Sequence, residues 1–220
     1  MLTLHDSLHS GNGYKVRLLL RMTGVPFRRV EYDLDAGETR TPAFLALNPN
    51  GRVPTVEFEG GRTLWESGAI LVRFAEGTPF LPADPDARAD VLQWLFFEQY
   101  SHEPYVAVVR NWVQHGLPPG DHKPAELAER REKGRAALQV LEDRLAGRDW
   151  LVGDRPTIAD IALYAYTHVA HEGDIPLDPY PAVQAWCARF AALPGHVPIT
   201  HDGGWESPPA TGAPAEAAGA

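Results

Sequence analysis

Cysteine is nearly absent from the sequence, since Cys187 is the single one in 220 residues. One cysteine excludes an internal disulfide framework and fits a reducing compartment, so we expect a cytoplasmic protein. The chain has no apolar run of the roughly 18 residues that suggest a membrane helix, and we expect no membrane partner. It opens MLTLHDS, without the basic segment and long apolar run of a secretory signal, which argues against export.

Positive charge is also scarce. The chain has 20 Lys and Arg against 29 Asp and Glu, which gives a net charge of −9. Because affinity for nucleic acid is carried mainly by cationic contacts, we expect no nucleic-acid partner. An apolar content of 44% beside 22% charged residues is typical of a globular protein.

The first part of the chain alternates between strand and helix periodicity. Strands are predicted at residues 2–5, 30–34, 55–58 and a short segment ending at 64, and helices at 16–24, 42–47 and 67–74. The segments NPNG (48–51) and EGG (59–61) are typical of turns. This order of elements predicts an α/β domain over residues 1–77.

A change of composition follows at residues 78–87, a proline-rich stretch that is typical of a linker. Residues 88–202 carry helical periodicity and predict an all-helical second domain. Within them Thr157 and Asp160 have the spacing of a capping box that opens an apolar helix. The tail, residues 203–220, is rich in Gly, Ala and Pro and is predicted to be disordered, with Trp205 as its one residue suited to docking.

Pro54 stands where the NPNG turn meets the predicted strand at 55–58. Proline removes a donor from the sheet ladder, so it belongs at a sheet edge or a strand start. A cis Val53–Pro54 bond is one reason for a proline at this position. It would turn the backbone of Val53 outward, toward a partner other than a neighbouring strand. A trans proline that merely ends a loop is the alternative.

Four motifs in order resemble the soluble glutathione S-transferases, closest to the bacterial, serine-type members of nu-like or phi-like character. The motifs are SLHSGNGYKVR (7–17), NPNGRVP (48–54, with arginine for the family's lysine), ESGAIL (66–71) and TIADI (157–161). The resemblance covers roughly residues 1–195. It implies an α/β thioredoxin-like N-terminal domain followed by an all-α helical-bundle C-terminal domain, glutathione as co-substrate, and a homodimer.

The resemblance assigns the binding of glutathione to Arg40, Arg52, Val53, Pro54, Glu66 and Ser67. The backbone of Val53 would pair with the cysteinyl part of the tripeptide, which behaves as a short added strand. Glu66 and Ser67 open a helix, whose positive end suits the α-carboxylate of the γ-glutamyl group. Arg52, and more weakly Arg40, would hold the glycine carboxylate. The alternative for Ser67 is an ordinary helix cap beside a solvated Glu66.

Ser10 and Asn12 precede the first predicted helix, where a donor and the helix dipole would favour a thiolate. The resemblance places Ser10 on the family's activating serine and Asn12 on the asparagine that nu-like members use beside it. Two alternatives stay open: either residue only caps the helix, or the hydroxyl of Ser7 contacts the sulfur.

The second domain offers weaker candidates. Tyr100 and Tyr105 lie in an aromatic run at helical spacing, and the resemblance implies that they line the electrophile pocket. Such a run is more often core. His168 and His171 are three residues apart but lack a third ligand at zinc-site spacing, so we expect no metal.

Two classes of function are compatible with these residues. The resemblance implies a glutathione S-transferase, which binds glutathione, stabilises its thiolate and directs it at a hydrophobic electrophile. Glutathione-dependent reduction of a disulfide or peroxide is the alternative chemistry. A non-catalytic binding module of the same fold is the second class. The presence of Ser10, Val53–Pro54 and Glu66–Ser67 favours the enzyme.

Overall fold

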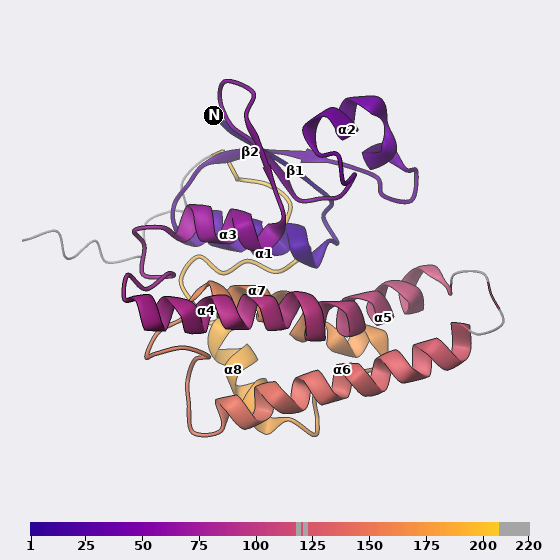
Figure 1. The fold of residues 1–220 in the computed structure, drawn as a ribbon, viewed down its shortest axis with the longest axis vertical. Helices are drawn as coiled ribbons and strands as arrows, with labels where there is room; N and C mark the ends of the chain where they lie inside the picture. Colours follow the sequence, from indigo (N-terminus) through magenta and orange to yellow (C-terminus); the bar gives the residue numbers. More distant parts are fainter. Residues whose placement is uncertain (118–119, 121–122, 207–220) are drawn as a thin grey trace, which may run out of the picture.

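A four-stranded sheet lies at one end of the molecule (Figure 1). The computed structural model describes residues 1–117, 120 and 123–206. The strands are β1 (Leu2–Asp6), β2 (Phe27–Glu31), β3 (Thr55–Glu57) and β4 (Thr63–Trp65), in the order β2-β1-β3-β4. The β1–β2 pair is parallel, and the other two pairs are antiparallel. This mixed sheet with its helices confirms the predicted thioredoxin-like first half.

Three α-helices belong to this half: α1 (Gly11–Met22), α2 (Pro42–Leu47) and α3 (Ser67–Ala75). Helices α1 and α3 lie between the sheet and the helical half, and α2 lies on the other side of the sheet (Figure 1). The prediction of helix 42–47 is confirmed. The strand predicted at 30–34 is displaced to 27–31, because β2 pairs with β1 from Leu2↔Phe27 to Asp6↔Glu31.

The rest of the described chain is helical. Its elements are α4 (Pro85–Phe97), a π-helix (Glu98–His102), α5 (Glu103–His115), α6 (Lys123–Leu145), α7 (Ile158–Thr167) and α8 (Pro181–Ala191). Helix α4 begins inside the predicted linker, because the Asp84 carboxylate accepts from the Ala87 N–H and Pro85 takes the first helical position. In the described part of the chain, no helix is both long and apolar enough to cross a membrane.

Helix α7 is buried along its whole length and forms the centre of the helical half. The predicted capping box at its start is confirmed, because Asp160 Oδ2 accepts from the Thr157 N–H at 2.8 Å. The other oxygen, Oδ1, accepts from the Leu151 N–H and the Trp186 indole at 3.1 and 3.0 Å. The Asp160 carboxylate therefore joins helix α7 to helix α8 and to the loop that precedes α7.

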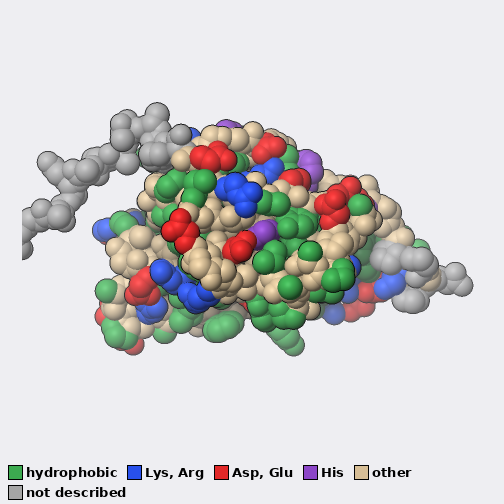
Figure 2. Space-filling view, turned by 90° about the horizontal axis from the view of Figure 1, so that it is seen from above, with side chains coloured by type: hydrophobic (Ala, Val, Ile, Leu, Met, Phe, Trp, Pro, Cys, Tyr) green, Lys and Arg blue, Asp and Glu red, His purple; other side chains and the backbone are tan. Residues whose placement is uncertain are grey.

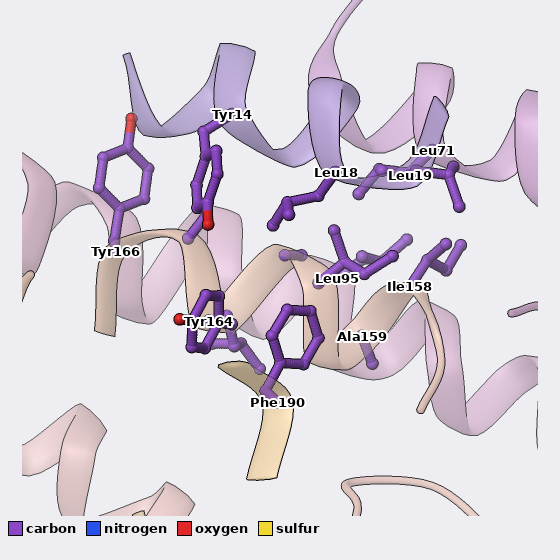
Figure 3. Packing of buried hydrophobic residues seen from close by; sticks show 14 of the residues in the cluster. Tyr14, Leu18, Leu19, Leu71, Leu95, Ile158, Ala159, Tyr164, Tyr166 and Phe190 are labelled. Atoms are coloured by element: carbon purple, nitrogen blue, oxygen red, sulfur yellow. The ribbon is translucent and has the colours of Figure 1, made fainter. Parts of the chain in front are cut away.

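The two halves share one core, in which α1 packs on α7 (Figure 3). Leu18 and Leu19 of α1 point toward α7, and Tyr166 lies beside the first turn of α1. On the face shown in Figure 2, acidic and basic side chains are interspersed with apolar ones, so neither sign of charge dominates it.

The prediction that disorder begins at residue 203 is wrong for residues 203–206. Trp205 is only 4% exposed and stacks on Phe27, with 5.2 Å between the ring centroids. Its carbonyl accepts from the Phe27 N–H at 3.0 Å, and the Gly204 carbonyl accepts from Arg21 at 2.9 Å. The buried Trp205 ring, one donor from the edge strand β2 and one from helix α1 hold this segment despite its composition. Residues 207–220 of the predicted tail lie outside the described residues.

We therefore expect Trp205→Ala to lower the free energy of unfolding by about 3 kcal/mol, the usual cost of removing a buried aromatic ring. Urea denaturation followed by far-ultraviolet circular dichroism measures it. Glu206→Ala, at the exposed neighbouring position, is the matched control and should change stability by less than about 0.5 kcal/mol. An unchanged denaturation midpoint in Trp205→Ala would contradict the docking.

Candidate functional site

Two clefts lie near the first turn of α1, where the two halves of the chain meet. The smaller, of about 60 Å³, is lined by Asn12, Asn48, Arg52, Val53, Pro54, Glu66, Ser67, Gln99 and Glu103. The larger, of about 500 Å³, is lined mainly by the β1–α1 loop, the segment 31–35 and α5. The smaller cleft brings together most of the residues that the sequence predicted to bind glutathione, although the larger one has more room.

The motif SGNG (10–13) holds the first turn of α1 against two neighbours. A Cβ at Gly11 would overlap the ring of Tyr166, and a Cβ at Gly13 would overlap the carboxylate of Asp6. The two glycines thus allow α7 and β1 to lie close to the first turn of α1, on either side of Asn12. The predicted helix at 16–24 starts earlier, at Gly11, because the glycines form its first turn instead of breaking it.

Asn12 is tied to both halves of the chain. Its backbone N–H donates to Tyr166 Oη at 3.1 Å. Its side-chain Oδ1 accepts from Lys15 Nζ at 2.6 Å and from Ser67 Oγ at 3.2 Å. Its Nδ2 donates to Glu103 Oε1 at 3.3 Å. The amide is held in one orientation at the wall of the smaller cleft.

Ser10 is the N-cap of α1, and its Oγ accepts from the Gly13 N–H at 3.1 Å. The hydroxyl proton stays free to donate elsewhere, so capping alone does not decide its role. Ser10 and Ser7 both line the larger cleft, whereas Asn12 lines the smaller one. Ser10 thus borders one cleft and Asn12 the other, although the sequence predicted that they act together.

The Val53–Pro54 peptide bond is cis, as the sequence led us to expect. Strand β3 begins only at Thr55, so Val53 lies outside the sheet ladder. Within the described residues, no hydrogen bond is made to the backbone N–H or C=O of Val53. Both backbone groups remain available at the wall of the smaller cleft.

Glu66 and Ser67 stand at the start of α3. Glu66 is the N-cap residue, with a φ of 71°, and it is exposed. Such a φ is uncommon for a residue with a side chain, and it costs of order 1–3 kcal/mol. The first N–H groups of a helix have no partner within the helix. Because these groups and Ser67 border the smaller cleft, it can accept an anionic group there.

The two predicted arginines lie in different places. Arg52 is exposed and lines the smaller cleft. Arg40 does not line that cleft. Its guanidinium donates to the Asn50 carbonyl at 3.1 Å. Arg40 thereby supports the turn at residues 48–51, where Gly51 has a φ of 63°.

The predicted electrophile residues line neither of the two clefts. Tyr100 is 83% exposed. Tyr105 is half-buried, and the Lys133 ammonium lies 5.4 Å from the centre of its ring. The aromatic run predicted as one wall belongs partly to the π-helix, whose wider turns direct neighbouring residues differently from an α-helix.

Three charged residues around Asn12 were not predicted from the sequence. Lys15 and Glu98 form a buried ion pair, with Nζ 2.7 Å from Oε1 and side chains only 1% and 2% exposed. Glu103 lies beside them, and burial raises the pKa of its carboxyl group above the usual value. The sequence carried no clear signal for them, because a lysine is rarely buried unless it is paired, and its partner Glu98 is 83 positions away.

A metal ion or a protein thiol would be a further source of reactivity. Among residues 1–117, 120 and 123–206, no group of three or more His, Cys, Asp and Glu is placed to hold a metal ion. The protein's own thiol is also a poor nucleophile, because burial raises the pKa of Cys187 to about 12 and keeps it protonated at neutral pH.

Known proteins resemble the chain along most of its length. Residues 1–72 match the N-terminal domain of glutathione S-transferases, and residues 89–194 match their C-terminal domain. The disulfide-bond oxidoreductase YfcG of Escherichia coli (strain K12) is 32% identical over 190 residues, covering 83% of this chain and 87% of that protein.

Solved structures also superpose on the chain along most of its length. A glutathione S-transferase from Pseudomonas fluorescens superposes with a TM-score of 0.87 at 47% identity, covering 91% of this chain and 99% of that one. Yeast Ure2p in complex with glutathione gives a TM-score of 0.79 at 27% identity, covering 88% of this chain and 96% of that one.

Proposed function

Since the chain belongs to the glutathione S-transferase family, we propose that it binds glutathione in the smaller cleft and stabilises the glutathione thiolate for attack on an electrophile. The observation that carries this proposal is the grouping of Asn12, Val53, Ser67 and Glu66 around one cleft. The related Ure2p has been solved in complex with glutathione, which supports the choice of ligand.

The tripeptide fits the order of groups along the cleft. Its cysteinyl backbone pairs with the free N–H and C=O of Val53 as an added strand. Its γ-glutamyl carboxylate meets the start of α3 at Ser67, and its ammonium meets Glu66. The exposed side chain of Arg52 reaches the glycine carboxylate.

The sulfur then lies beside Asn12. The Asn12 amide faces the cleft with a nitrogen donor, and a donor at the start of a helix favours a thiolate over a thiol. Ser10 stays a prediction for the same role. Ser10 lines the other cleft, so we assign Asn12 the larger effect.

The larger cleft receives the acceptor substrate. It adjoins the first turn of α1 through Ser10 and Gly11, and Tyr166 separates it from the deeper core. Its lining includes Asp33 and Arg110, which suits an acceptor with polar groups better than a purely apolar one.

Disulfide reduction is the second candidate reaction. A relative at 32% identity is named a disulfide-bond oxidoreductase, and the same thiolate could attack a disulfide sulfur. The high pKa of Cys187 means that this chemistry also has to use an external thiol.

The test of the proposed chemistry is a pH–rate profile for wild type, Asn12→Ala, Ser10→Ala and Ser7→Ala with glutathione and one chloronitrobenzene. In Asn12→Ala we expect the pKa of the bound thiol to rise by about one unit, a tenfold loss of thiolate below that pKa. The lost rate should return at high pH, where thiolate forms unaided. A shift in Ser10→Ala or Ser7→Ala alone would assign the donor to that serine. Failure of the wild type to bind glutathione would refute the proposed function.

Ser67→Ala should weaken glutathione binding more than it slows the reaction at saturation. The γ-glutamyl end is remote from the sulfur and contributes binding that is the same before and during reaction. A lost hydrogen bond to a charged group costs about 1.5–3 kcal/mol, or about ten- to a hundredfold in affinity. Isothermal calorimetry and the Michaelis constant for glutathione measure it. If both are unchanged, Ser67 does not hold the tripeptide.

A homodimer is the proposed assembly. Trp65, Phe96 and Tyr100 are large hydrophobic side chains that are 38%, 72% and 83% exposed, and a second copy would cover them. We expect Phe96→Glu to weaken dimerisation at least about tenfold, because it would bury a charge. Sedimentation velocity measures it, with Leu45→Glu on α2 as the control for an exposed leucine. A monomeric wild type at micromolar concentration would contradict the dimer.

A further inference from the structure

The ammonium group of Lys15 is buried next to the smaller cleft and contacts Glu98, Asn12 and Tyr166. The Lys15 side chain is 1% exposed. Nζ donates to Glu98 Oε1 at 2.7 Å and to Asn12 Oδ1 at 2.6 Å, and it lies 5.3 Å from the centre of the Tyr166 ring. An ammonium group has three donors and no acceptor, so Lys15 can only donate, and two of its three donors make these hydrogen bonds.

This contact decides which way the Asn12 amide faces. An amide presents an oxygen acceptor on one side and a nitrogen donor on the other. Because Lys15 can only donate, the oxygen must face it, and the nitrogen must face Glu103 and the cleft. Ser67 also donates to this oxygen. When the Ser67 hydroxyl turns to a bound γ-glutamyl carboxylate, Lys15 remains as the donor that holds the oxygen.

We propose that Lys15 is a positioning residue, which fixes the Asn12 amide with its N–H groups toward the cleft and so sets the donor that the glutathione sulfur meets. The inference rests on the proposed function and deepens it. It assigns the orientation of the thiolate donor to a buried charge that does not itself border the cleft.

The π-helix explains how two carboxylates reach this point from one segment. Glu98 and Glu103 are five residues apart, and in an α-helix of 3.6 residues per turn their side chains would point well away from each other. The π-helix Glu98–His102 has a wider turn with i→i+5 geometry, which brings positions five apart to one side. Glu98 thereby meets Lys15, and Glu103 meets Asn12.

Titratable groups from several elements surround the Asn12 amide, and Lys15 is the cation that contacts it. From α1 comes the Lys15 cation, from the π-helix and α5 come Glu98 and Glu103, and from α7 comes Tyr166, whose pKa is raised by burial. His102 is neutral, because burial and the nearby ammonium lower its pKa to about 3. Of these groups Lys15 is the one that can only donate to the Asn12 amide, so the orientation of the amide depends on it.

The experiment removes the buried pair and asks whether the effect passes through Asn12. Lys15→Met with Glu98→Leu replaces both charges by apolar groups, which leaves no unpaired buried charge. The pKa of the bound glutathione thiol is read from its ultraviolet absorbance against pH. We expect it to rise by about one unit, while affinity for glutathione in its thiol form changes less than about threefold. In the Asn12→Ala background the same pair should cause no further rise.

Glu98→Gln is the matched control, because it keeps an acceptor for Lys15 and leaves the contact between Lys15 and Asn12 in place. It should not raise the thiol pKa, whereas a merely structural role would make every break of the ion pair act in the same direction. Should the apolar pair fail to fold, Lys15→Gln with Glu98→Gln keeps buried hydrogen bonds without either charge. Because a glutamine amide can accept as well as donate, it no longer forces the Asn12 oxygen toward it, so a smaller rise with the same dependence on Asn12 is expected.

The outcomes separate this inference from the proposed function. A wild type that does not bind glutathione refutes the proposed function, and the inference falls with it. A wild type that binds glutathione with a lowered thiol pKa, together with a charge-free pair that keeps that pKa, overturns the inference alone. An equal rise in the Asn12→Ala background overturns it as well, because Lys15 would then act on the sulfur directly by its charge.

Discussion

The close approach of α1 to Tyr166 on α7 decides how the two halves of the chain fit together. Gly11 has no side chain to obstruct the ring, and the Asn12 N–H donates to the tyrosine oxygen. The Lys15 ammonium lies over the same ring. One aromatic residue of the helical half therefore fixes the helix that carries the proposed thiolate donor. A larger residue at position 11 would separate the halves and displace the donor together with them.

The smaller cleft belongs to neither half alone. Val53, Glu66 and Ser67 come from the first half, whereas Gln99 and Glu103 come from the π-helix and α5 of the second. The Asn12 amide is held by donors and acceptors from both sides. The proposed binding of the tripeptide would thus be coupled to the packing between the halves, which share one buried core.

Much of the fold could be predicted, because local patterns carry it. The helix at 42–47, the strand after Pro54 and the Thr157–Asp160 capping box depend on neighbouring residues. The surroundings of Asn12 could not be predicted, since Lys15 meets Glu98 from 83 positions away. The turn direction of a π-helix and the docking of Trp205 likewise depend on contacts that no spacing in the sequence records.

The docked segment at Trp205 also bears on how the sheet avoids unwanted association. Strand β2 is an outer strand, and such edges are templates for pairing with other chains. Here the Trp205 carbonyl accepts from the Phe27 N–H, and the exposed Arg28 places positive charge along the edge. The neighbouring Arg29 is paired with Asp202, next to the docked segment. Because synthesis proceeds from the N-terminus, the sheet is complete long before its cover is made. During that interval, the exposed charge of Arg28 disfavours pairing of this edge with another chain.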